Sequence, residues 1–153
     1  SRMRQLRAVR SRGRSTRFKG YGQGVPEAAS GQPVCEGWFC VQPVLFRSGL
    51  RNRYIDAINN AAAQLSGQTN VYDILVPNNS GVLLSDDELD KLGGSDQKQA
   101  IEYYYGMMNG VKTVDIFDTL KAHKDEYIFF RTDHHWTADG AYYAYEDFCK
   151  TKA

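Results

Sequence analysis

The first regular hydrophobic pattern in the chain begins after Ser48. Apolar residues recur at a spacing of three to four from Tyr54 to Leu65, which is the period of an α-helix with one buried face. Gly67 follows and can adopt the left-handed conformation that commonly ends a helix. The next apolar run, Val71 to Val76, is short and is closed by Pro77. This pattern predicts a helix followed by a buried strand.

Helix and strand patterns then alternate to the end of the chain. A second helix is predicted with Ser95 as its N-cap, Asp96 just inside it and Gly110 at its end. The apolar residues that share its predicted face are Ile101, Tyr104, Tyr105 and Met108. The elements predicted after it are a strand over 111–117, a short helix from Asp118 to Lys124, a strand from Tyr127 to Arg131 and a helix capped by Thr137. The last helix is predicted to bury a stripe formed by Ala141, Tyr145, Phe148 and Cys149.

This alternation predicts an α/β fold with a short, mostly parallel sheet. The segment from Asn78 to Gly81 is polar and is predicted to be a loop, and the acidic residues from Asp86 to Asp90 indicate a solvated turn of helix. Three strands make a narrow parallel sheet, so we expect this region to be part of a larger domain. An incomplete sheet would leave an edge open, which predicts a tendency to self-associate.

The charge is unevenly distributed along the 153 residues. Residues 1–20 hold eight basic side chains and no acidic one, so the rest of the chain has a net negative charge. An arginine-rich arm with few large apolar residues cannot offset its chain entropy by burial, which predicts disorder. Such an arm could bind nucleic acid or another anionic surface. No aromatic residue lies among its arginines to stack on bases, so we do not expect nucleic acid to be a partner.

Residues 1–47 are predicted to form a basic arm and a Gly/Pro-rich linker, and residues 48–153 the α/β region. No apolar run reaches the length of a membrane span, and the N-terminus lacks the apolar stretch of a secretory signal. Cys35 and Cys40 lie five residues apart, which matches neither a zinc site nor a thioredoxin-type pair. A local disulfide is conceivable, but the total of three cysteines leaves the redox compartment open.

Candidate chemistry is concentrated between a predicted strand and the last helix. This segment runs Arg131-Thr132-Asp133-His134-His135-Trp136-Thr137, and ligands of open α/β sheets bind at the carboxyl ends of strands. An Asp two residues before a His can fix the tautomer of the imidazole, whose other nitrogen then serves as a general base toward a serine hydroxyl. Asp133 and His135 are therefore the candidate catalytic pair. Candidates for the site wall or auxiliary roles are His134, Trp136, Thr137 and Arg131.

Other interpretations of these residues remain open. His134 is interpreted as a turn residue, and Asp133 could simply cap the following helix. Imidazoles and a carboxylate could also bind a transition metal, but adjacent histidines rarely reach one ion together. We therefore expect neither a metal nor a cofactor.

The segment resembles the DHHW protein family, whose name matches Asp133, His134, His135 and Trp136. More distantly it is similar to the Asp-x-His-Trp segment of the alginate O-acetyltransferases, members of the SGNH hydrolase-like superfamily. The resemblance extends over roughly 51–152, and the further stretches that carry it are 111–115, 120–127 and 140–145. It implies a flavodoxin-like three-layer fold, with Asp133 orienting the ring and His135 acting as the base. It also implies acyl-ester hydrolysis or transfer on a cell-envelope carbohydrate, and an extracellular or envelope location.

Two features depart from this family pattern. In the acetyltransferase relatives the nucleophilic serine follows the Asp-x-His segment on a Gly-Asp-Ser-like turn, and no such turn is present here. Ser80 and Ser95 lie outside that context, so neither is a good substitute. Residues 1–46 match nothing expected of the family, and we expect the sequence to be a fragment that is inactive alone. The alternative functions are a noncatalytic envelope or carbohydrate-binding module of the same fold, and an anionic-surface binder that uses the basic arm.

Overall fold

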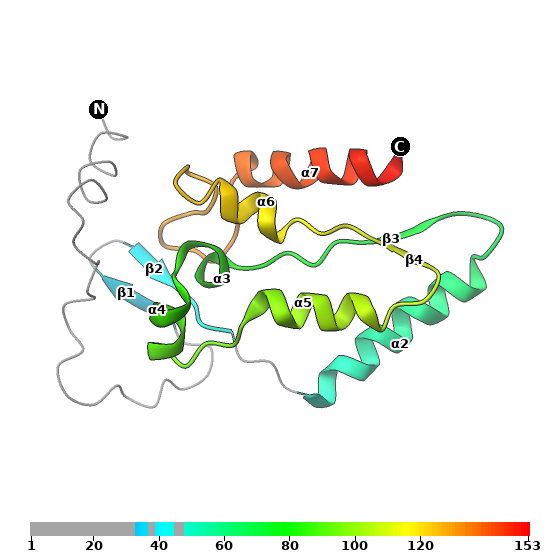
Figure 1. Ribbon diagram of the computed structural model, residues 1–153, viewed down its shortest axis with the longest axis horizontal. Helices are drawn as coiled ribbons and strands as arrows, with labels where there is room; N and C mark the ends of the chain where they lie inside the picture. The colour runs from blue at the N-terminus through cyan, green and yellow to red at the C-terminus, as the bar shows by residue number, and fades with distance from the viewer. Residues whose placement is uncertain (1–32, 37–38, 45–47) are drawn as a thin grey trace.

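The computed structural model describes residues 33–36, 39–44 and 48–153 (Figure 1). The predictions for the basic arm fall outside these residues, as do those for most of the linker. Two strands come first, β1 (Val34–Glu36) and β2 (Phe39–Val41), and they pair as an antiparallel hairpin. A disulfide between Cys35 and Cys40 joins them. This hairpin lies within the segment whose composition resembles a linker.

The helices follow the hydrophobic spacing closely. Helix α2 (Ser48–Gln64) covers the predicted first helix, and Gly67 after it has a φ of 77°, as expected for a left-handed terminator. Helix α4 (Asp86–Lys91) holds the acidic residues, and its cap is a reciprocal pair of hydrogen bonds between Ser85 and Glu88. The other three helices predicted from the sequence are present as α5 (Gln97–Gly106), α6 (Phe117–Ala122) and α7 (Ala138–Lys152). None of the described helices is both long and apolar enough to cross a membrane.

The parallel sheet has two strands, β3 (Val71–Asp73) and β4 (Val111–Thr113), with Val71 opposite Val111. Helices α6 and α7 lie on one side of this pair and α2 and α5 on the other (Figure 1). The predicted α/β class is therefore confirmed, with strands shorter than expected. The third predicted strand, over 127–131, is wrong. In its place is an extended segment whose Phe129 forms an isolated antiparallel bridge with Trp136.

Two buried clusters hold these elements together. The larger lies beneath α6 and α7 and consists of Val82, Val114, Ile116, Leu120, Ile128, Phe129 and Ala144. The smaller joins the hairpin to α4, because Val41 of β2 is fully buried with Leu84, Leu89 and Leu92. Burial of such side chains is the main favourable contribution to folding. The hairpin is thus packed into the α/β region.

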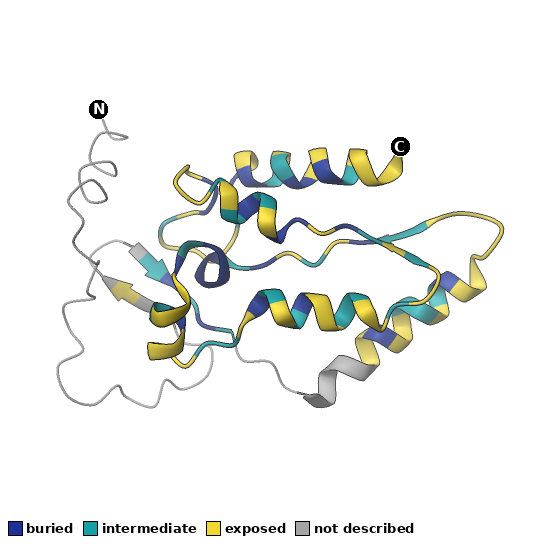
Figure 2. Ribbon diagram, viewed as in Figure 1, coloured by how far each residue is buried: buried dark blue, intermediate teal, exposed yellow. Residues whose placement is uncertain are grey.

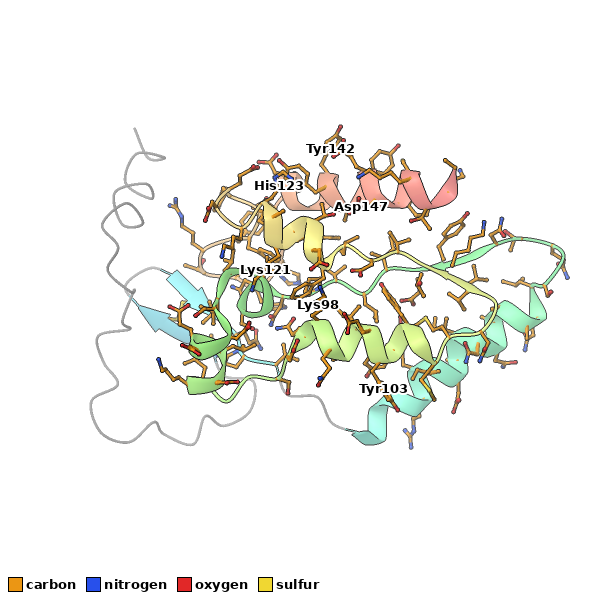
Figure 3. The ribbon with its side chains drawn as sticks, in the orientation of Figure 1. Lys98, Tyr103, Lys121, His123, Tyr142 and Asp147 are labelled. Carbon is orange, nitrogen blue, oxygen red and sulfur yellow. A yellow bond between two sulfur atoms is a disulfide. The ribbon has the colours of Figure 1, made fainter. Side chains whose placement is uncertain are left out.

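The polar segment at Asn78 corrects the sequence analysis most clearly. The predicted polar loop is wrong, because residues Asn79–Leu83 form a short helix, α3, that is buried over most of its length (Figure 2). Its polar side chains are satisfied by hydrogen bonds rather than by water, as buried polar groups must be. Lys121 of α6 donates to the carbonyl oxygens of Gly81 and Leu84 at the end of α3, and burial lowers the pKa of its amine (Figure 3).

Two details of the predicted helices also change. The N-cap of α5 is Asp96 rather than Ser95, since the Asp96 side chain accepts the backbone N–H of Gln99. The predicted stripe on α7 is wrong at Tyr145 and Cys149, which are exposed. The buried positions of α7 are Gly140, Ala144 and Asp147. Asp147 can occupy this face because Lys150 donates to its carboxylate at 2.8 Å. A charged residue does not match a pattern of apolar spacing, so the spacing did not predict this buried position.

Candidate functional site

The loop that carries Asp133 and His135 is closed by backbone hydrogen bonds. The N–H of Phe130 donates to the carbonyl oxygen of His135 at 3.1 Å, and the N–H of Thr137 donates to that of Ile128 at 2.9 Å. These bonds flank the Phe129–Trp136 bridge, so Phe130 lies opposite His135 on the same face of the pair. Phe129 and Trp136 occupy the other face, where Phe129 is buried in the core. The His135 face is therefore the one turned to solvent.

The structure brings the candidate pair together. Oδ1 of Asp133 lies 2.5 Å from Nδ1 of His135 and also accepts the backbone N–H of His135 at 2.8 Å. The pKa of the Asp133 carboxyl lies below its ordinary value. The main cause is the hydrogen bond from the backbone N–H of His135, and the second is the hydrogen bond from the His135 ring. A carboxylate at Nδ1 favours the tautomer with a proton on that atom. Nε2 of His135 is then left as the basic nitrogen.

His134 lies beside this pair without entering it. Its Nδ1 is 3.7 Å from Oδ1 of Asp133, which is longer than a hydrogen bond, and its ring centre is 4.2 Å from that of His135. All three side chains are substantially exposed. The arrangement therefore distinguishes the two histidines, since only His135 is hydrogen-bonded to the carboxylate.

The auxiliary candidates have structural contacts. Thr137 caps α7: its hydroxyl accepts the N–H of Gly140 at 3.4 Å and donates to the carbonyl oxygen of Tyr127 at 2.7 Å. The predicted cap is thus confirmed. Trp136 packs against the larger core cluster, and the guanidinium of Arg131 lies 5.3 Å from the ring centre of Tyr127. The ring of Tyr127 also contacts that of Phe130, which is exposed.

The three side chains Asp133, His134 and His135 are close enough to bind one ion. One ligand atom from each lies within 4.8 Å of the others, although adjacent histidines were expected to be too constrained for this. Carboxylate and imidazole are suitable ligands for zinc or copper. The spacing of these three groups is therefore compatible with one bound ion.

The candidate serines differ from a free nucleophile. Ser80 is fully buried, and its hydroxyl lies 2.9 Å from the carbonyl oxygen of Gln42 and accepts from Gln97 at 3.1 Å. The backbone N–H of Ser95 donates to the carbonyl oxygen of Val44. Within residues 33–36, 39–44 and 48–153, no serine hydroxyl hydrogen-bonds to His135. Among the described residues, neither Ser80 nor Ser95 is therefore paired with His135.

Sequence analysis missed two neighbours of the loop. The peptide of Cys40 lies against it, because its N–H donates to the carbonyl oxygen of Arg131 at 2.6 Å. The Asn79 side chain reaches the carbonyl oxygen of Asp133. The one available signal was the position of Asn79 just after a predicted strand, since ligands and functional loops gather at the carboxyl ends of parallel strands.

Comparisons with known proteins identify the family and the fold. The family model described as DHHW protein matches residues 39–152. The match thus begins in β2, earlier than the boundary that composition placed near Arg47. A crystal structure of a DHHW family protein from Eubacterium siraeum is similar, with a TM-score of 0.66 and 28% identity. That alignment covers 80% of this chain and 40% of the other.

A second solved structure shares the fold at lower identity. It is PatB1 from Bacillus cereus with a sulfonyl adduct, with a TM-score of 0.62 and 18% identity, and the alignment covers 79% of this chain and 44% of PatB1. No curated protein matched the sequence. This chain therefore spans less than half the length of either solved relative.

Proposed function

Because the chain belongs to the DHHW protein family, we propose that it is the base-bearing part of an SGNH-like serine acyl esterase or O-acetyltransferase. The observation that carries this proposal is the contact between Oδ1 of Asp133 and Nδ1 of His135. The same residues form the DHHW segment. An ionised Asp behind a His is the orienting half of a Ser-His-Asp triad.

The proposed chemistry follows from the exposed ring of His135. Nε2 removes the proton from a serine hydroxyl as its oxygen attacks the acyl carbonyl, and the Asp133 carboxylate stabilises the imidazolium that forms. The imidazolium then donates its proton to the leaving oxygen, and a serine ester remains. Attack of water on that ester completes hydrolysis, whereas attack of a sugar hydroxyl transfers the acyl group to the sugar. The serine comes from a segment beyond the described residues.

The shared fold with PatB1 supports the reaction class. Sulfonyl reagents attach to nucleophilic side chains, so a sulfonyl adduct in that protein is compatible with covalent catalysis on this fold. The acceptor in our proposal is a carbohydrate of the cell envelope, as the family resemblance implies. An extracellular or envelope location is part of the same proposal. The Cys35–Cys40 disulfide supports it, because such bonds persist in oxidising compartments.

The test compares two neighbouring histidines in the protein at its natural length. Hydrolysis of 4-nitrophenyl acetate is measured for the unchanged protein, His135→Ala and His134→Ala. We expect His135→Ala to lower kcat by about 10²–10⁴, the usual contribution of a positioned base. His134→Ala should have a small effect, since His134 is not hydrogen-bonded to Asp133. Equal losses would contradict the roles assigned here.

A noncatalytic carbohydrate-binding module would give a different result. It would bind envelope glycan with the same affinity before and after His135→Ala, and it would show no ester turnover that depends on His135. Glycan binding measured by calorimetry on the same two variants therefore separates the two functions.

A further inference from the structure

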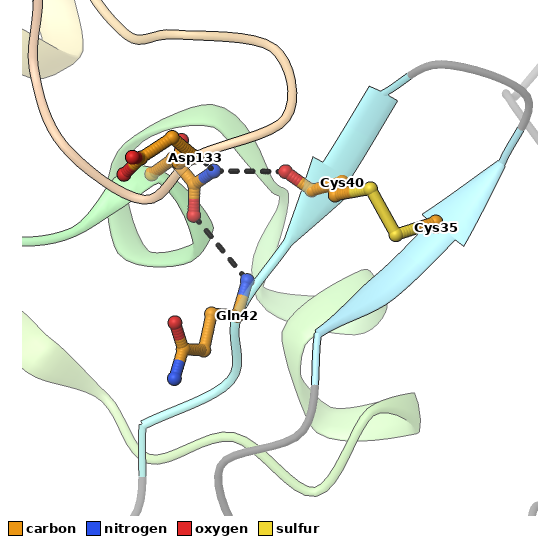
Figure 4. Close-up of a disulfide and its surroundings, with 5 residues drawn as sticks. Cys35, Cys40, Gln42 and Asp133 are labelled. Carbon is orange, nitrogen blue, oxygen red and sulfur yellow. Dashed lines mark hydrogen bonds between the residues drawn. A yellow bond between two sulfur atoms is a disulfide. The ribbon is translucent and has the colours of Figure 1, made fainter.

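Asn79 joins three segments that are distant in the sequence. It is the first residue of α3, and its side chain is fully buried. Nδ2 donates to the carbonyl oxygen of Cys40 at 2.9 Å and to that of Asp133 at 3.4 Å (Figure 4). Oδ1 accepts the backbone N–H of Gln42 at 3.4 Å. One amide group therefore connects α3, the end of the β1–β2 hairpin and the loop that carries the catalytic pair.

The hairpin supplies a fixed support for this connection. The disulfide closes it, and Val41 anchors it in the smaller core cluster. Cys40 is connected to the loop in two ways: its N–H donates directly to the carbonyl oxygen of Arg131, and Asn79 bridges its carbonyl oxygen to that of Asp133. The loop is thus held at two backbone positions, two residues apart and just before His135.

Polar side chains hold the residues on either side of Asn79. We call Asn78, Asn79, Ser80 and Gln97 the polar cluster. Asn78 donates to the carbonyl oxygen of Gln42 at 2.7 Å, and Gln97 donates to Asn78 at 2.6 Å and to Ser80 at 3.1 Å. A Cβ at position 81 would lie 2.6 Å from the Gln97 side chain, so a larger residue there would displace Gln97 from these hydrogen bonds. A fully satisfied buried network of this kind is rigid.

This support matters because the catalytic pair has little packing of its own. The side chain of Asp133 is 50% exposed and that of His135 is 65% exposed. Exposed side chains are free to change rotamer unless their backbone and hydrogen bonds hold them. The direction of the Asp133 carboxylate therefore depends on how firmly the peptide groups around it are held.

We propose that Asn79 is a positioning residue, which holds the Asp133 peptide against the disulfide-closed hairpin so that the carboxylate stays aligned with Nδ1 of His135. This inference rests on the proposed function, since it concerns the alignment of the same pair. Asn79 touches neither substrate nor reacting atoms, and it acts through Asp133. Without its amide the loop loses the link from Asp133 to Cys40, while the direct hydrogen bond from Cys40 to Arg131 remains.

The test records ¹⁵N chemical shifts of the His135 ring nitrogens, which report the tautomer, in the full chain. Asn79→Ala is compared with Ser80→Ala, a matched change at the next residue. Ser80 is equally buried and bonds to the same hairpin, but it does not contact the loop. Asp133→Asn gives the signature of a lost carboxylate. Asn79→Ser, a milder change whose hydroxyl cannot span both carbonyl oxygens, replaces Asn79→Ala if that variant does not fold.

We expect Asn79→Ala to lose the Nδ1–H signature as Asp133→Asn does, and Ser80→Ala to keep it even where its Tm falls. Wild-type ring shifts in a folded Asn79 variant would overturn the inference, and so would equal losses in Asn79→Ala and Ser80→Ala. Unchanged shifts in Asp133→Asn would instead show that the pair itself does not form. That outcome overturns the proposed function, whereas the first two overturn the role of Asn79 alone.

Discussion

The carboxylate of Asp133 accepts two hydrogen bonds from the same residue, His135, one from its backbone N–H at 2.8 Å and one from its ring at 2.5 Å. The backbone bond closes a tight turn that any residue at position 135 would form. The ring bond depends on histidine. The turn therefore positions the carboxylate of Asp133 independently of the side chain at position 135, and the imidazole of His135 binds to a carboxylate that the turn holds in place.

This order of effects predicts how Asp133 titrates. Its pKa is lowered mainly by the backbone N–H of His135, so in His135→Ala it should rise but stay below the ordinary value of about 3.9. A depressed pKa stabilises the fold above the unfolded-state pKa, and that stability is lost as the pH falls through the folded-state pKa. The measurement is ¹³C NMR of the Asp133 carboxyl, with His134→Ala as the control. A complete return to the ordinary pKa would show that the turn is absent.

The disulfide predicts a measurable loss of stability on reduction. Cys35 and Cys40 are five residues apart, and the entropy of closing so short a loop corresponds to about 2 kcal/mol. Urea unfolding with and without reductant, or of the Cys35→Ser/Cys40→Ser protein, should show this decrease. Cys149→Ser is the control, because Cys149 is a free and exposed cysteine whose loss should change stability by less than about 0.5 kcal/mol. Equal stability of oxidised and reduced protein would count against a structural role of the hairpin.

Gly140 is predicted to tolerate no side chain. A Cβ there would lie 2.5 Å from the carbonyl oxygen of Ile128, so α7 would have to move away from the loop. We expect Gly140→Ala to cost about 1–3 kcal/mol in free energy of unfolding. Gly106→Ala is the matched change, since a Cβ on that helical residue meets nothing within 4 Å, and it should stabilise by up to about 1 kcal/mol. A neutral Gly140→Ala in thermal unfolding would show that α7 does not approach the loop this closely.

Tyr105 is predicted to limit stability at alkaline pH. Its hydroxyl accepts the N–H of Leu75 and donates to the carbonyl oxygen of Val114, both at 2.8 Å, and burial raises its pKa to about 12. The folded state holds this proton more tightly than the unfolded state. The contribution of Tyr105 to stability is therefore fully present below about pH 10 and is lost as the pH rises toward 12.

Replacing the hydroxyl tests this assignment. Tyr105→Phe should cost about 1–3 kcal/mol at neutral pH, because it leaves two backbone groups unpaired. It should also flatten the alkaline decline in Tm, while the remaining decline reflects groups such as Tyr54, whose pKa is raised as well. Tyr142→Phe, at an exposed position of α7, should change neither quantity. An unchanged alkaline slope in Tyr105→Phe would assign the decline to other groups.

The sequence alone determined the features that arise within a few residues. Helical spacing located α2, α5 and α7, and the predicted cap at Thr137 is confirmed, because each such signal acts over one or two turns. The Asp133–His135 contact is equally local, since the two residues are two apart. The α/β class followed from the order of these elements.

The tertiary structure decided what surrounds the pair. Asn79 lies 39 residues from Cys40 and 54 from Asp133, and no local pattern specifies contacts over such separations. The polar segment at Asn78 was predicted to be a loop because of its composition, yet it forms a buried helix whose side chains hydrogen-bond to one another and to the backbone of Gln42. The predicted third strand likewise became a bridged loop, because Phe129 pairs with Trp136 instead of a parallel neighbour. Burial of a polar side chain is favourable only when distant partners arrive together, and that is fixed by the packing of the whole fold.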